Sequence, residues 1–273
     1  KKDTPVMVVL GNPPYSGESA NKGEWISNLM DDYKIEPGGS MKLKEKNSKA
    51  INADEYKFIR YGQHYIEKNG SGILAFINPH TFLDASICRG MRWSLLKTFD
   101  KICTIDLHGN STKKETALDG SADVNVFDIM QGVSINLFVK TGKKKKNELA
   151  QVFHFDLFGK RDFKYNYLHE NSLKSFEWNE LKPETPNFFL VKKDFDGSKE
   201  YEKGISLGEL FLSISTGVET GDDEKFIKFR KENFVEETIE NFEKDKIEHI
   251  IYRPFDVRYC YYENRILRRA AFK

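Results

Sequence analysis

The chain has 273 residues, of which 39% are hydrophobic and 31% charged, a composition typical of a soluble globular protein rather than a disordered one. Its 43 basic and 42 acidic residues give a formal net charge of +1, so no overall basicity points to a nucleic-acid partner. No window approaches the roughly 20 apolar residues of a membrane span, and the three cysteines form no C-x-x-C pair. We therefore expect a cytoplasmic protein with no membrane partner, no zinc ribbon and no disulfide framework.

Apolar and periodic segments alternate along the first half of the chain. Residues 6–10 (VMVVL) predict a strand buried on both faces, residues 23–34 a short amphipathic helix, and residues 36–53 a long mobile loop. The pattern continues with a helix over 54–68, a strand over 72–78, a helix over 85–99, and strands over 102–107 and 133–139. Strands separated by helices predict an α/β fold with a mostly parallel, doubly wound sheet.

The pattern changes after the lysine run at 143–146, where β-rich and aromatic segments replace the alternation. We expect one domain over residues 1–142, a linker or insertion over 143–200, and the start of a β-rich domain over 201–273. We expect this chain to be a fragment that is truncated at both ends.

The strongest chemical signal is Asn12-Pro13-Pro14-Tyr15, which follows the first strand, where open α/β sheets bind their ligands. Two prolines remove two backbone donors, so the loop presents rigid carbonyl oxygens, and Asn12 adds another acceptor. Two acceptors that hold the hydrogens of an exocyclic amine localise its lone pair for methylation, and Tyr15 can stack on the base. The alternative is a rigid turn, because Asn-Pro and Pro-Pro are common turn dipeptides.

The segment VVLGNPPYSG, residues 8–17, resembles the catalytic motif of amino-group methyltransferases, particularly the adenine-N6 DNA methyltransferases. Residues 76–96 and 102–110 are similar to the strand, helix and strand that follow the catalytic loop in that family. The resemblance implies a Rossmann-like sheet, catalytic roles for Asn12, Pro13, Pro14 and Tyr15, a substrate contact by Ser16, and S-adenosyl-L-methionine as cofactor. Its partner would be double-stranded DNA, from which the base is flipped out.

Residues 125–143 are similar to the family segment that carries a second aromatic residue, which sandwiches the flipped adenine. Phe127 is therefore a candidate substrate-binding residue. The alternative is a core phenylalanine, one of 21 in the chain.

Residues 214–226 and 252–262 resemble the start of the target-recognition region in single-chain restriction-modification enzymes of type IIG and the type I single-polypeptide form. This makes 1–142 the catalytic domain without its cofactor-binding part, and 201–273 the start of target recognition, with a fused or associated restriction endonuclease as a possible partner. Arg253 and Arg258, and with them Arg265, Arg268 and Arg269, are interleaved with tyrosines and are candidates for DNA contacts. The alternative is a strand with outward arginines and inward tyrosines, which would show the same sequence pattern.

The sequence departs from this family because the glycine-rich turn and the acidic residue expected for the cofactor are absent. We assign no residue to S-adenosyl-L-methionine and expect most of its site to lie outside this fragment, which leaves the fragment alone without full activity. The six histidines show no metal-ligand spacing, so no metal is expected. The alternatives are a protein-glutamine or RNA amino methyltransferase, and a non-catalytic DNA-binding module.

Overall fold

The computed structural model describes residues 5–15, 17, 19–45, 48–117, 119–145, 147–210, 219–235, 239–253 and 255–263. The chain divides into two compact units, Lys1–Asp194 and Phe195–Lys273. This division differs from the expected boundaries at 142 and 200. Residues 143–194 belong to the first unit because they add two strands to its sheet and place Phe188 and Leu190 in its core.

A six-stranded sheet forms the centre of the first unit, in the order β1-β2-β4-β3-β5-β6. The strands are β1 (Val8–Gly11), β2 (Gly72–Pro79), β3 (Lys101–Asp106), β4 (Val133–Lys140), β5 (Gln151–Asp156) and β6 (Asn179–Leu181). β1 runs parallel to β2 and β3 parallel to β5, but β4 is antiparallel to both of its neighbours, and β6 to β5. The α/β class is confirmed, and β1, β2, β3 and β5 run in one direction as expected of a mostly parallel sheet, but β4 and β6 run against them and make the sheet mixed. The described residues between β3 and β4 contain no helix that would carry the chain back across the sheet, and β4 returns antiparallel.

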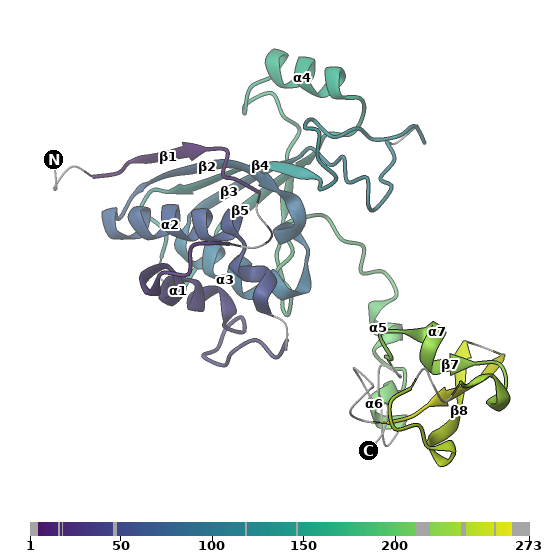
Figure 1. The fold of residues 1–273 in the computed structure, drawn as a ribbon. Helices are drawn as coiled ribbons and strands as arrows, with labels where there is room; N and C mark the ends of the chain where they lie inside the picture. Colours follow the sequence, from purple (N-terminus) through teal and green to yellow (C-terminus); the bar gives the residue numbers. More distant parts are fainter. Residues whose placement is uncertain are drawn as a thin grey trace. The chain divides into compact units, whose positions relative to one another are not determined.

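Two hydrophobic clusters lie on the two faces of this sheet. Figure 1 shows α1 (Glu24–Met30), α2 (Asp54–Asn69) and α3 (Arg89–Thr98) together on one face, and α4 (Arg161–Glu170) on the other side. Short 3₁₀ helices cover Asp31–Lys34, Ser48–Asn52, His80–Leu83 and Ser86–Cys88. Side chains along β3 point alternately to the two faces of the sheet. Ile102 therefore packs in the cluster beneath α1–α3, and Ile105 packs in the cluster on the opposite face.

β1 lies at the edge of the sheet and is more exposed than its sequence predicts. Val9 packs against the core beneath the helices, but Val8 and Leu10 are 59% and 79% exposed. They share the opposite face with Ile73 of β2, which is also exposed. The prediction of burial on both faces is wrong for this chain, because no other described segment pairs with the outer edge of β1 or covers these side chains.

The described residues of segment 36–53, which was expected to form a mobile loop, are anchored to the rest of the first unit. Arg89 at the start of α3 donates hydrogen bonds to the carboxylates of both Glu36 and Glu45. Ile51 is completely buried in the core beneath the helices. The absence of a period therefore predicted irregular structure correctly, but not these contacts.

The second unit contains a three-stranded antiparallel sheet in the order β7-β9-β8. Its elements are α5 (Ser198–Tyr201), α6 (Leu207–Leu210), α7 (Asp223–Phe226), β7 (Ile227–Lys228), β8 (Ile247–Arg253), β9 (Asp256–Tyr261) and 3₁₀ turns at Lys231–Asn233 and Lys244–Lys246. Phe226, Ile247 and Tyr261 are buried in its core. None of the helices in the described part of the chain is long and apolar enough to cross a membrane.

Candidate functional site

Four strands of the first unit end at the same edge of the sheet. β1, β2, β3 and β5 all point in one direction, because β4 is antiparallel to both β2 and β3. The chain therefore leaves the sheet at this edge after Gly11, Pro79, Asp106 and Asp156. Ligands of open α/β sheets bind at such carboxyl ends.

Asn12, Pro13, Pro14 and Tyr15 form the loop that leaves β1 at this edge. Asn12 and Pro14 are exposed, Pro13 is buried and Tyr15 is half-buried. The Tyr15 hydroxyl donates to Asn12 Oδ1 at 2.8 Å and to the Ile77 carbonyl of β2 at 3.2 Å. The hydroxyl thus ties the loop to the neighbouring strand and holds the Asn12 amide in one orientation.

Tyr15 keeps its proton at neutral pH. Burial and the charge of Glu55 together raise the pKa of Tyr15 to about 12, because both disfavour a phenolate. Glu55 itself is buried with Oε2 lacking a hydrogen-bond partner, and burial raises its pKa. Sequence reasoning did not select Glu55, whose position in the first turn of α2 resembles that of any acidic residue at a helix start.

The structure brings Phe127 next to Tyr15. Their ring centroids are 6.4 Å apart with an angle of 52° between the planes, and both rings pack at the margin of the cluster around Ile105. The Phe127 amide donates to Asn125 Oδ1, and the Asn125 side-chain amide donates to the carbonyl of Gly109. The segment before β4 is therefore held in place by the loop after β3.

The chain that follows Tyr15 is attached to α2. Lys57, which is largely buried, donates to Ser19 Oγ at 2.8 Å and to the carbonyl of Asn21. Ser16, a predicted substrate contact, lies outside the described residues.

The predicted DNA contacts Arg253 and Arg258 lie on the hairpin of β8 and β9 and differ in their surroundings. Arg258 donates to Asp256 at 2.8 Å and lies 4.1 Å over the ring of Phe229 and 4.2 Å over that of Tyr252. Arg253 is exposed, with its guanidinium 5.2 Å from the Tyr252 ring centroid. Arg258 is thus engaged within its own unit, and Arg253 is the more available of the two. Arg265, Arg268 and Arg269 lie outside the described residues.

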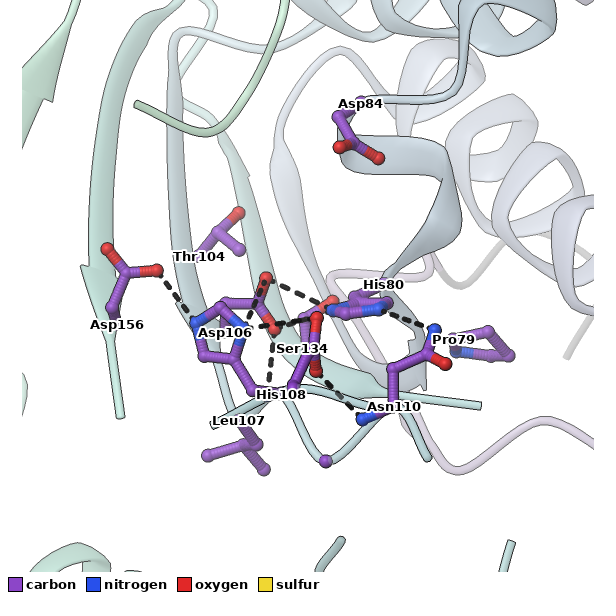
Figure 2. A network of polar contacts seen from close by, with 12 residues as sticks. Pro79, His80, Asp84, Thr104, Asp106, Leu107, His108, Asn110, Ser134 and Asp156 are labelled. Atoms are coloured by element: carbon purple, nitrogen blue, oxygen red, sulfur yellow. Dashed lines mark hydrogen bonds and ion pairs between the residues drawn. The ribbon is translucent and has the colours of Figure 1, made fainter. Parts of the chain in front are cut away.

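A polar network at the same sheet edge was not predicted from the sequence. Figure 2 shows His80, Asp106, His108 and Asp156 directed toward one another from the ends of β2, β3 and β5. His80 Nδ1 lies 2.9 Å from Asp106, and His108 Nε2 lies 2.8 Å from Asp156. Each residue lies at or within two residues of the end of a predicted or observed strand, a shared position that could have identified the set.

Comparison with protein families gives one match. Residues 186–273 match the model of the Type ISP C-terminal specificity domain. The match includes the second unit and begins within the first, before the boundary at Asp194. No curated protein matches the chain.

Solved structures share the fold of almost the whole chain. An ATP-dependent Type ISP restriction-modification enzyme, LlaBIII bound to DNA, is similar over 99% of this chain and 21% of its own, with 20% identity and a TM-score of 0.74. A nuclease-deletion mutant of the Type ISP enzyme LlaGI, in complex with a DNA substrate mimic, matches over 96% of this chain and 30% of its own, with 18% identity and a TM-score of 0.69.

The DrdV–DNA complex matches over 96% of this chain and 31% of its own, with 20% identity and a TM-score of 0.68. This chain therefore has the fold of a segment that makes up less than a third of each of these longer chains. At such identities the likeness shows the fold alone.

Proposed function

We propose that the first unit is the base-binding half of an adenine-N6 DNA methyltransferase within a restriction-modification enzyme, and that the second unit takes part in recognising the DNA target. The observation that carries this proposal is the pairing of Tyr15 with Phe127 beside Asn12, at the carboxyl edge of the sheet. Phe127 lies far from Asn12 and Tyr15 in the sequence, and the family resemblance alone proposed it as the second stacking group. The Type ISP specificity-domain match at residues 186–273 supports the role of the second unit.

In the proposed reaction the adenine ring binds against Tyr15 and Phe127, and its N6 amine donates to Asn12 Oδ1 and the Pro13 carbonyl. Asn12 Oδ1 already accepts from Tyr15, but an amide oxygen has two lone pairs and can accept a second hydrogen bond. Two acceptors on one amine localise the nitrogen lone pair and so hold the amine in the geometry of a nucleophile. A flipped base is held this way without sequence-dependent contacts to its ring faces.

S-adenosyl-L-methionine would supply the methyl group, but the described residues provide no suitable turn for it. A cofactor loop needs several glycines between a buried strand and the start of a helix. The connection between β5 and α4 contains a single glycine, Gly159. We therefore assign no residue of this chain to the cofactor and derive no step through it. The apolar, exposed face of β1 is a surface that a preceding part of a longer protein would cover.

The test is transfer of labelled methyl groups from S-adenosyl-L-methionine to unmethylated duplex DNA by the longer protein that carries this chain. Label on adenine N6 that is lost in Asn12→Ala but kept in Asn166→Ala, an exposed position on α4, supports the proposal. Label only on protein or RNA substrates would favour the amino methyltransferase alternatives. Salt-sensitive DNA binding without any transfer would favour a non-catalytic module.

A further inference from the structure

We propose that the loop after β3 and the end of β2 form a binding site for one divalent transition-metal ion of the Zn²⁺ class, with His80, His108 and Glu115 as ligands. One ligand atom from each of these residues lies within 4.8 Å of those from the other two. This site is separate from the proposed methyl transfer, and its test does not depend on that activity.

The hydrogen bonds of the two histidines leave one nitrogen of each ring for a ligand. Asp106 binds Nδ1 of His80 at 2.9 Å, so an ion would bind at Nε2, where it would replace the 3.4 Å hydrogen bond with the Asn110 side-chain amide. Asp156 takes Nε2 of His108 at 2.8 Å, so Nδ1 is directed toward Glu115, whose Oε1 lies 3.8 Å away. Against the opposing effect of burial, the carboxylates of Asp156 and Glu115 raise the pKa of His108 to about 9, so an ion that binds at Nδ1 would displace the proton there, because imidazole binds metal ions in its neutral form.

The outer contacts match those that support metal ligands in proteins. A metal-bound histidine almost always donates its other ring N–H to a carboxylate or carbonyl, and bound carboxylates are hydrogen-bonded in turn. Asp106 is the carboxylate partner of His80, and Asp156 is that of His108. Glu115 Oε2 accepts a hydrogen bond from the backbone N–H of Asn110 at 2.8 Å. All three proposed ligands therefore have a second layer of contacts that orients them.

The chemistry of the set also selects the ion. Two imidazoles and one carboxylate suit Zn²⁺ and its neighbours, whereas Mg²⁺ and Ca²⁺ prefer oxygen ligands alone. A cavity of about 180 Å³ lies against His80, His108 and Glu115 and is also lined by Lys113, Lys192 and Lys193, which leaves room for a water ligand beside the ion. His154, buried nearby with neither ring nitrogen hydrogen-bonded, shows that the polar groups of this region are not fully satisfied by the protein alone.

A metal ion here would fix the loop that holds the Phe127 segment. Glu115 and His108 belong to the loop between β3 and β4, whereas His80 follows β2, so shared ligation joins two separate parts of the chain. Gly109 lies between the ligands and accepts from the Asn125 side chain, which in turn accepts from the Phe127 amide. Metal binding would therefore stabilise the position of Phe127 without touching the base.

The experiment uses untagged protein, stripped with a chelator and titrated with Co²⁺ and then Zn²⁺. We expect about one ion per chain, a Co²⁺ visible spectrum of nitrogen and oxygen ligation, and a melting temperature that rises by about 5 °C with Zn²⁺. Glu115→Gln keeps the size of the side chain and His108→Gln removes the imidazole, so both should weaken binding at least about tenfold. His169→Gln, at an exposed position on α4, should bind like the wild type.

Each other outcome overturns the proposal. A folded wild-type chain that binds no ion at micromolar concentration would show that the network is held by hydrogen bonds alone. Cobalt–thiolate absorption would assign the ion to cysteine instead. Equal binding by wild type, Glu115→Gln and His108→Gln, with circular dichroism confirming folded variants, would place the ion elsewhere.

Discussion

The Tyr15 hydroxyl donates a 2.8 Å hydrogen bond to Asn12 Oδ1, the same oxygen that the proposed reaction needs as an acceptor. The contact orients the amide before a substrate arrives, while the second donation to the Ile77 carbonyl keeps the Tyr15 ring at the edge of the sheet. Tyr15 therefore combines two tasks, which its hydroxyl and its ring perform separately. Substitutions can separate them.

Tyr15→Phe should keep base binding within about threefold, because the ring remains and the Asn12 oxygen is released. Tyr15→Ala should weaken it by about 1–3 kcal/mol, the usual loss when an aromatic platform for an unpaired base is removed. Fluorescence of 2-aminopurine at the target position of duplex DNA, with the longer protein that carries this chain, measures both. Equal losses in the two variants would show that the hydroxyl, not the ring, carries the interaction.

Phe127→Ala should also weaken base binding by about 1–3 kcal/mol. The Phe127 ring lies beside that of Tyr15. The loss of base-binding free energy in the Tyr15→Ala, Phe127→Ala double variant should therefore differ from the sum of the losses in the two single variants. The same fluorescence assay measures this coupling. Phe163→Ala, on the exposed side of α4, is the matched control and should bind normally; strict additivity would mean that the two rings do not act on one base.

The sequence was informative where one local pattern determines the structure. The period and the Asn69-Gly70 ending of α2 predicted its bounds almost to the residue, and Gly70 adopts the left-handed conformation that ends it. The pairing of Phe127 with Tyr15 was implied only by family resemblance. The antiparallel direction of β4 and the addition of β5 depend on contacts between distant segments, which no local period encodes. The same holds for the proximity of His80 to His108 and Glu115, because it arises only when the ends of β2 and β3 meet in the sheet.

Arg253 and Arg258 should have different effects on DNA binding. Arg253→Gln should lower affinity for duplex DNA and reduce the slope of log affinity against log salt by about 0.9 if it contacts one phosphate. Arg258→Gln should mainly destabilise the second unit, since its guanidinium is stacked between Phe229 and Tyr252 and paired with Asp256. Fluorescence anisotropy at several salt concentrations and thermal melting distinguish the two effects. An unchanged salt slope in Arg253→Gln would remove this residue from the interface.

Arg92 should be among the residues most costly to replace. Its side chain is completely buried and donates to the carbonyls of Phe82, Ala85, Asn187 and Phe188. Arg92→Met keeps much of the volume but leaves two buried and two partly buried carbonyl acceptors without this donor, which should lower the free energy of unfolding by at least about 3 kcal/mol. Urea denaturation measures the loss. Lys97→Met, at an exposed position of the same helix, is the control and should change stability by less than about 0.5 kcal/mol.

The contact of Arg89 with Glu36 and Glu45 should make the stability of the first unit depend on pH. Hydrogen bonds from Arg89 lower the pKa of both carboxyls below the ordinary value of 4.5. A carboxyl with a lowered pKa in the folded state stabilises that state fully above the unfolded value and loses this contribution as the pH falls through the folded value. Arg89→Gln should therefore cost about 1 kcal/mol at pH 7.

The difference in melting temperature between wild type and Arg89→Gln should shrink as the pH falls from 5 toward 3, because protonated Glu36 and Glu45 no longer gain from the guanidinium. High salt at pH 7 should shrink it only in part, since the Arg89 side chain is 11% exposed and its hydrogen bonds are screened less than a surface ion pair. A difference that stays constant from pH 7 to pH 3 would mean that Arg89 stabilises the fold by packing. The segment between Glu36 and Glu45 would then be held by the burial of its neighbours rather than by charge.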